Sequence, residues 1–78
     1  HYNMKTNYLK IKVRIGNSYL WLRNISWGTS PINKVFVTDP DDAGYFFQDQ
    51  IDAIRKELVN IEVFYWDNEL HQLMPQNQ

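Results

Sequence analysis

The sequence predicts an α+β fold in which one amphipathic helix covers one face of a mostly antiparallel sheet of three to four strands. Two observations lead to this prediction. Segment 8–15 alternates apolar and polar residues, which is the period-two pattern of a half-buried strand. Ile51, Ile54 and Leu58 instead recur at helical intervals, and alternation resumes directly after them.

Three strands are expected before the helix and one after it. The first spans Tyr8–Ile15, and Gly16-Asn17 predicts a two-residue hairpin turn after it. The returning strand, Tyr19–Trp27, has blurred alternation at Leu20-Trp21-Leu22, which indicates apolar contacts on both faces or a β-bulge. A short buried strand is expected at Lys34–Thr38. The sheet is completed by the strand that follows the helix.

Acidic residues mark two helix starts. Asp39 and Pro40 suit the start of one short helical turn, and Gly44 suits its end. Tyr45–Phe47 is either a short strand or a packed lead-in to the main helix, for which Asp49 is a natural N-cap. Burying the three branched aliphatic side chains of that helix contributes about 5–9 kcal/mol, at about 1.5–3 kcal/mol each. This is comparable to the net stability of a small domain, so the helix needs a sheet to pack on.

The 78 residues are enough for one domain. We interpret residues 1–3 as a tag remnant, 4–70 as the domain and 71–78 as a loose C-terminal tail. No apolar run approaches the ~20 residues that cross a bilayer, and no signal peptide is recognisable, so we expect a cytoplasmic protein without membrane contact. There is no cysteine, but there are three tryptophans, five tyrosines and four phenylalanines. Stability is therefore expected from the packing of large side chains.

Charge is divided unevenly along the chain. No acid precedes Asp39, whereas all nine acids lie from that residue onward. Such a split is typical of a basic surface that binds a polyanion. It is equally typical of a sheet in which basic first strands pair with an acidic last strand. We favour the second interpretation for a fold this small.

Residues suited to catalysis or metal binding are scarce. His71 is the single histidine outside the tag remnant, and no serine lies in a nucleophile motif. Asp39, Asp41 and Asp42 followed by Gly44 match only part of a calcium loop, because two key ligand positions hold alanine and glutamine. We interpret these aspartates as helix caps. The sequence therefore predicts a protein that is not an enzyme and holds no metal or cofactor.

Large aromatic residues outnumber those that a single helix can cover. Some of them must therefore lie on the open sheet face or at an edge, and the candidates are Trp21, Trp27, Phe64 and Trp66. An exposed apolar patch marks a site for a protein partner or for a second copy of the chain, and a partner can also add a strand to a sheet edge. The alternative is a small second core on that face, closed by tail residues Leu70, Leu73 and Met74.

Cations alternate with aromatic rings on the first hairpin, which gives a second functional hypothesis. Single-stranded nucleic acid is bound by cations that contact phosphates and by rings that stack on bases. The candidate residues are Tyr8, Lys10, Lys12, Arg14 and Arg23. The competing interpretation is a solvated outer face, and an isoelectric point of about 6.1 favours it. A third hypothesis, a small ligand between helix and sheet, needs a pocket that so small a core can hardly spare.

Three features of the chain belong together. They are the hairpin Ile15–Leu20, the segment Val37-Thr38-Asp39 followed by Asp42-Ala43 and Phe46, and an alanine-bearing helix before Ile61-Glu62-Val63. Together they resemble short uncharacterised proteins of phages and prophages of Gram-positive bacteria. The resemblance implies a phage accessory protein that acts on a host factor, with anti-defence or anti-CRISPR inhibition as an example, and it transfers no site residues. We therefore predict a non-enzymatic protein-binding module with a host or phage protein as partner, and single-stranded nucleic-acid binding as the alternative.

Overall fold

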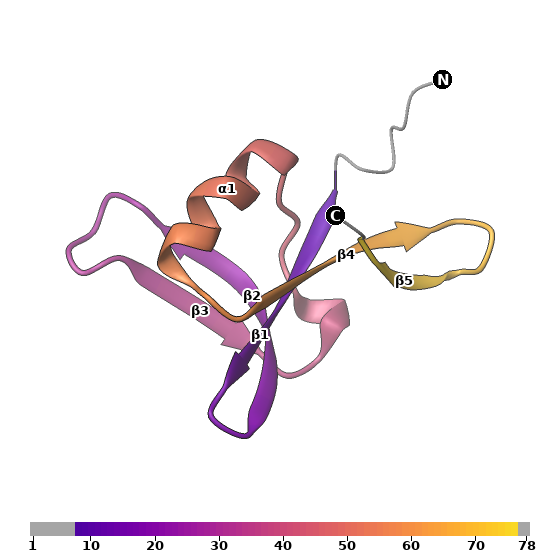
Figure 1. Ribbon diagram of the computed structural model, residues 1–78, viewed down its shortest axis with the longest axis horizontal. Helices are drawn as coiled ribbons and strands as arrows, with labels where there is room; N and C mark the ends of the chain where they lie inside the picture. Colours follow the sequence, from indigo (N-terminus) through magenta and orange to yellow (C-terminus); the bar gives the residue numbers. More distant parts are fainter. Residues whose placement is uncertain (1–7, 77–78) are drawn as a thin grey trace.

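The computed structural model describes residues 8–76 as an α+β fold, which confirms the predicted fold class (Figure 1). The expected tag remnant at 1–3 and the last two residues of the expected tail lie outside these residues. No helix within residues 8–76 is long and apolar enough to cross a membrane. The elements in chain order are β1 (Leu9–Ile15), β2 (Ser18–Ser26), β3 (Asn33–Val37), the 3-10 turn η2 (Pro40–Asp42), α1 (Gln48–Glu57), β4 (Ile61–Asp67) and β5 (Gln72–Pro75).

The strands form one antiparallel sheet of five in the order β3-β2-β1-β4-β5. The prediction of three to four strands therefore missed one, and the missing strand is β5, which pairs with β4 in the segment expected to be a loose tail. Asp67 shapes the turn between them, since its Oδ1 accepts backbone hydrogen bonds from Glu69 and Leu70 at 2.8 and 3.0 Å. A strand of four residues is too short for its alternation to be recognised in the sequence.

β3 forms one edge of the sheet. The sequence predicts a short buried strand at Lys34–Thr38, and the strand is present one residue earlier, at Asn33–Val37. Its expected burial is wrong, because every residue in it is exposed or half-buried. The reason is its position: β3 has a neighbouring strand on one side only.

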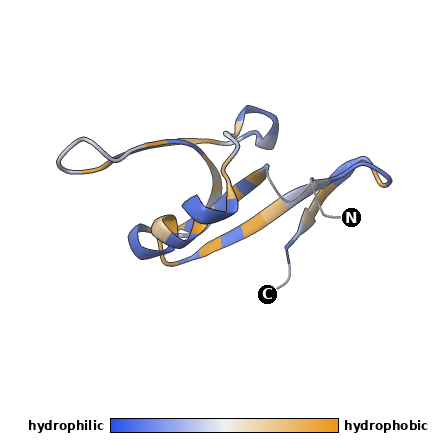
Figure 2. Ribbon diagram, turned by 90° about the horizontal axis from the view of Figure 1, so that it is seen from above, coloured by the Kyte–Doolittle hydropathy of each residue, from blue (hydrophilic) through white to orange (hydrophobic). Residues whose placement is uncertain are grey.

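The hydrophobic core lies between α1 and one face of the sheet (Figure 1). Leu9 and Ile11 of β1 are fully buried, and so are Ile51 and Ile54 of α1, while Leu58 at the end of the helix is half-buried. Figure 2 shows the underlying alternation as hydrophobic and hydrophilic bands along a strand. Further buried residues of the same core come from β1, β2 and β4, namely Val13, Leu22, Ile25 and Val63.

A β-bulge in β2 explains the blurred alternation in that strand. Leu22 lies opposite Phe36 of β3, but the next pair is Asn24 with Val35, so Arg23 is the additional residue. Because the bulge shifts the register by one position, Ile25 points to the same face as Leu22 and is buried. Trp21 is buried on the opposite face. Both of the alternatives suggested by the sequence, a bulge and apolar contacts on two faces, are therefore present.

The N-cap of the main helix lies two residues before the predicted one. Asp49 was the predicted N-cap, but the N-cap is Phe47 and Asp49 lies in the first turn. The Phe47 side chain cannot accept a hydrogen bond, but the Gln50 Oε1 accepts one of 2.8 Å from the Phe47 N–H. The Gln50 N–H in turn donates to the Phe47 carbonyl oxygen at 2.9 Å. This is the reciprocal half of a capping box, and it does not need a polar residue at the cap itself.

The connection from β3 to α1 first forms the expected helical turn. Asp39 caps η2, since its Oδ1 accepts a hydrogen bond of 2.9 Å from the Asp41 N–H. This bears out the interpretation of the aspartates as caps. Lys10 then ties the turn to the sheet, because its Nζ donates to the Pro40 carbonyl oxygen at 2.6 Å. Lys10 alternates with Leu9 and Ile11, so this contact lies on the sheet face opposite α1.

After η2 the chain passes between β1 and β2. The Leu9 N–H donates to the Phe46 carbonyl at 2.9 Å and the Phe46 N–H to the Leu9 carbonyl at 2.8 Å, while the Gly44 N–H donates to the Leu22 carbonyl at 3.1 Å. On its other side Leu9 pairs with β4, and on its other side Leu22 pairs with β3. The segment therefore fills the space where β1 and β2 separate. A Cβ at Gly44 would collide with the Arg23 carbonyl oxygen. Glycine is required here by this close approach, and not by the end of a helix as predicted.

Candidate functional site

The sheet face opposite α1 carries a cluster around Lys12. Its Nζ lies 4.8 Å from the ring centroid of Tyr19 and 5.8 Å from the centroids of both Trp21 and Phe64. The rings of Trp21 and Phe64 are tilted by 58° with centroids 5.2 Å apart. Trp21 is only 9% exposed and Phe64 is half-buried. These two residues therefore form a small second core with Lys12 across it, and they do not belong to an open aromatic patch.

The division of charge along the chain is reflected in the strand order. β1, which carries the cations, lies directly beside β4, and Lys12 is opposite Glu62. This is the arrangement expected if basic first strands pair with an acidic last strand. The Lys12 ammonium nevertheless lies over aromatic rings, which stabilise a cation through their negative faces.

The other cations of the nucleic-acid hypothesis also have partners within the chain. Lys10 is 7% exposed and donates to Pro40, as described above. The Arg23 guanidinium donates to the Asp42 carbonyl oxygen at 2.6 Å, and the Arg14 Nε donates to the Gly16 carbonyl oxygen at 3.3 Å. Lys10 and Arg23 thereby hold η2 and the connection against the sheet. Nucleic-acid binding by this face stays a prediction.

Two adjoining hollows open on this face between the connection and the β4–β5 hairpin. One has a volume of about 410 Å³ and is lined by Tyr8, Tyr45, Trp66 and Asn68. The other, of about 390 Å³, shares the three aromatic residues and adds Lys10, Asp41 and Leu73. We call the two together the aromatic hollow. Its volume is in the range of ligand sites, which are about 300–1,000 Å³.

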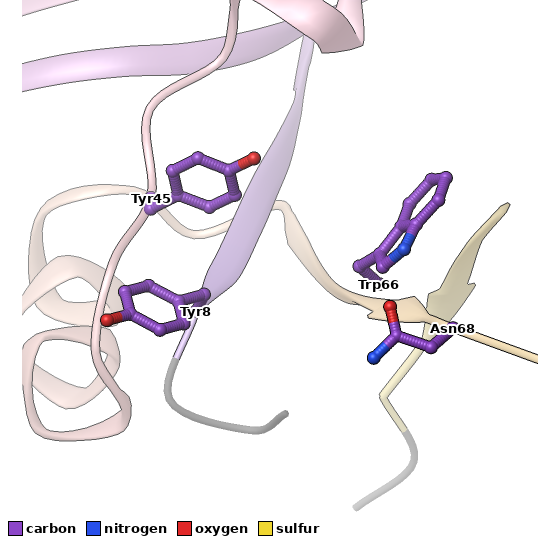
Figure 3. A pocket seen from close by; sticks show the side chains of 4 residues that line it. All are labelled: Tyr8, Tyr45, Trp66 and Asn68. Carbon is purple, nitrogen blue, oxygen red and sulfur yellow. The ribbon is translucent and has the colours of Figure 1, made fainter. Parts of the chain in front are cut away.

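Large exposed rings form opposite walls of the aromatic hollow (Figure 3). Tyr8 and Tyr45 are each more than half exposed, and their rings meet edge to face with centroids 5.9 Å apart. Trp66 stands on the other side beside Asn68, and the Tyr45 hydroxyl points toward it whereas the Tyr8 hydroxyl points away. The Phe47 ring also packs against the Tyr8 ring, with centroids 5.7 Å apart. The rings are therefore preorganised around a space that protein atoms leave open.

The structure separates the four predicted aromatic residues. Trp66 lines the aromatic hollow and Trp21 and Phe64 pack around Lys12, while Trp27 lies in the turn that follows β2. Trp27 and Trp66 are similarly exposed, at 42% and 43%. The predicted single aromatic patch is thus divided into a closed cluster, an open hollow and one isolated side chain.

Four residues that line the hollow were not predicted as site residues, namely Asp41, Tyr45, Asn68 and Leu73. Asp41 was interpreted as a helix cap and Leu73 as a tail residue that closes a second core. Tyr45 was interpreted only as part of a short strand or lead-in, and Asn68 was placed in a segment where the pattern decays. Tyr45 and Asn68 both reach the hollow through long-range structure. Tyr45 lies on the connection from β3 to α1, which runs between β1 and β2, and Asn68 lies on the β4–β5 turn. The only local signal was the position of Tyr45 beside a glycine in an otherwise apolar run.

The single histidine within residues 8–76 is His71. His71 is exposed in the β4–β5 turn with a φ of 53°. Within residues 8–76 there is no group of three or more His, Cys, Asp or Glu residues able to hold a metal ion. Chemically, the aromatic hollow offers apolar contact, an amide, an exposed carboxylate and one buried ammonium.

No protein-family model, curated protein or solved structure matches the chain.

Proposed function

We propose that this chain is a non-enzymatic protein-binding module whose partner docks in the aromatic hollow. The observation that carries the proposal is the set of three exposed rings, Tyr8, Tyr45 and Trp66, around one open volume. Aromatic residues are enriched at the centres of protein interfaces because they bury much surface at a low cost in conformational entropy. Exposing them to water in a folded domain is unfavourable unless a partner covers them.

The identity of the partner rests on the sequence. The resemblance to short phage and prophage proteins supports a protein of the bacterial host as the partner, and inhibition of a host defence enzyme as the outcome of binding. The small sheet supports the same role, since its strands hold the aromatic side chains on a rigid surface.

The test compares two tryptophan substitutions. The chain carrying a photo-crosslinker would be expressed in a Gram-positive host, and crosslinked partners would be identified by mass spectrometry. Trp66→Ala is expected to remove a specific crosslinked partner, because it deletes one wall of the aromatic hollow. Trp27→Ala is the matched control, since it removes an equally exposed tryptophan outside the hollow.

Two results would contradict the proposal. One is a partner that is lost with Trp27→Ala but retained with Trp66→Ala, which would place the interface at the β2–β3 turn. The other is the absence of any protein partner together with salt-sensitive binding of a single-stranded oligonucleotide, which would favour the nucleic-acid alternative. Far-UV circular dichroism and thermal unfolding would establish that both variants are folded.

A further inference from the structure

Lys10 brings a buried positive charge to the wall of the aromatic hollow. Its side chain is 7% exposed, and it lines the hollow together with Tyr45 and Trp66. Within the described residues its ammonium has two partners. These are the Pro40 carbonyl oxygen at 2.6 Å and the Tyr45 ring, whose centroid lies 5.0 Å from Nζ. An ammonium has three N–H donors, and the hydrogen bond to Pro40 uses one of them.

Neither of these partners carries a negative charge. Burying a charge without a counter-charge is unfavourable, because neither a carbonyl dipole nor a ring fully replaces the lost hydration. The acid that lines the same hollow, Asp41, is exposed, so water and salt screen its carboxylate. An anionic oxygen placed beside Lys10 would supply the missing counter-charge where screening is weaker.

The apolar and cationic parts of the hollow lie close together. Tyr45 lines both of the adjoining volumes, and the Lys10 ammonium lies over its ring. A ligand that fills both parts must therefore carry an apolar group and an anion within about one residue of each other. The carboxyl-terminal residue of a protein meets this requirement, because its side chain and its α-carboxylate share one Cα. A chain end also reaches a deeply buried ammonium more easily than an internal segment, which must leave the hollow in two directions.

We propose that the aromatic hollow binds the carboxyl-terminal residue of the partner protein. Its carboxylate pairs with Lys10, and its apolar side chain packs between Tyr45 and Trp66. Capture of a terminal carboxylate is a known mode of peptide recognition. This inference rests on the proposed protein-binding function, and it names the part of the partner that is recognised.

The test uses a pair of peptides that differ only in the terminal charge. Fluorescein-labelled Gly-Ser-Gly-Ser-Gly-Phe would be titrated by fluorescence polarisation at low ionic strength, once as the free acid and once as the C-terminal amide. The free acid is expected to bind about tenfold more tightly, which corresponds to one charge-assisted hydrogen bond. A third peptide, amidated and with glutamate before the phenylalanine, distinguishes an internal acid from a chain end. It is expected to bind no more tightly than the plain amide.

Substitutions then assign the preference to Lys10. Lys10→Met is expected to abolish the preference for the free acid, so that the free acid and the amide bind with equal affinity. Lys56→Met, which removes the same charge from the exposed surface of α1, is expected to retain it. Asp41→Asn serves as a second variant that leaves the hydrogen bond between Lys10 and Pro40 in place. It is expected to increase the preference for the free acid over the amide about twofold, because it removes a charge of the same sign as the peptide carboxylate.

The outcomes separate this inference from the proposed function. Equal binding of acid and amide, with both weakened by Trp66→Ala, would overturn the role of the carboxylate but leave a protein-binding hollow. A preference for the free acid that persists in Lys10→Met would overturn the assignment to that residue. If the amidated glutamate peptide matches the free acid, the source is an internal acid and not a chain end. Failure of all three peptides to bind would also overturn the inference, while the crosslinking comparison would still decide the proposed function.

Discussion

Gly44→Ala tests how tightly the connection is held between β1 and β2. The added Cβ would collide with the carbonyl oxygen of Arg23, which is a backbone atom and cannot rotate away. Relieving the collision requires the connection to move, which lengthens the 3.1 Å hydrogen bond from the Gly44 N–H to the Leu22 carbonyl. Overpacking costs about 1–3 kcal/mol and a lost backbone hydrogen bond about 1 kcal/mol. The lower entropy of the unfolded alanine chain offsets about 0.4–1 kcal/mol of this.

The expected result is a loss of about 2–3 kcal/mol in the free energy of unfolding. Urea unfolding followed by tryptophan fluorescence and circular dichroism would measure it. Gly28→Ala is the matched control, because nothing lies within 4 Å of a Cβ built there. It is expected to change stability by less than about 1 kcal/mol. Equal unfolding midpoints for the two variants would refute the close approach of Gly44 to Arg23 and the position of the connection derived from it.

Two further substitutions test the helix and its cap. Ile54→Ala is expected to destabilise the domain by about 2–5 kcal/mol because the side chain is fully buried, whereas Val59→Ala, at an 85% exposed residue, should change stability by less than about 0.5 kcal/mol. The same urea assay decides, and similar losses for both would contradict the core described above. Gln50→Ala removes the hydrogen bond to the Phe47 N–H and should cost about 1 kcal/mol. Gln48→Ala, two residues earlier, is the control of the same residue type and removes only the exposed hydrogen bond that Gln48 Oε1 accepts from Gln76 Nε2 at 3.1 Å, so equal losses would mean that Gln50 does not cap the helix.

The fold was largely predictable where a periodic pattern extends over many residues. β1 needed only the alternation of Leu9, Ile11 and Val13, and α1 only the helical spacing of its isoleucines. The bulge in β2 was also visible, because an interruption of the period leaves adjacent apolar residues in the sequence. Short elements were less predictable: β5 has four residues, and its pairing depends on a turn that Asp67 stabilises through its own side chain.

The candidate site was predictable only in part. The surplus of aromatic residues correctly indicated that some would stay exposed, and Trp66 is one of them. Their grouping was not predictable, because it depends on the path of the connection. That path brings Tyr45 beside Tyr8 and places the Pro40 carbonyl oxygen within hydrogen-bonding distance of the Lys10 ammonium. Such contacts join residues thirty or more positions apart, and no local period encodes them.

The first strand of the chain is the last to be completed. β1 pairs with β2 at Lys12–Ile15, while on the same edge Leu9 pairs with Phe46, and its other edge pairs with β4 at Leu9–Val13. On the ribosome, the first hairpin can close as soon as it emerges, but the inner edge of β1 stays open until β4 has been made. The backbone of Leu9–Val13 therefore lacks its partner strand on that edge until residues 61–65 have emerged.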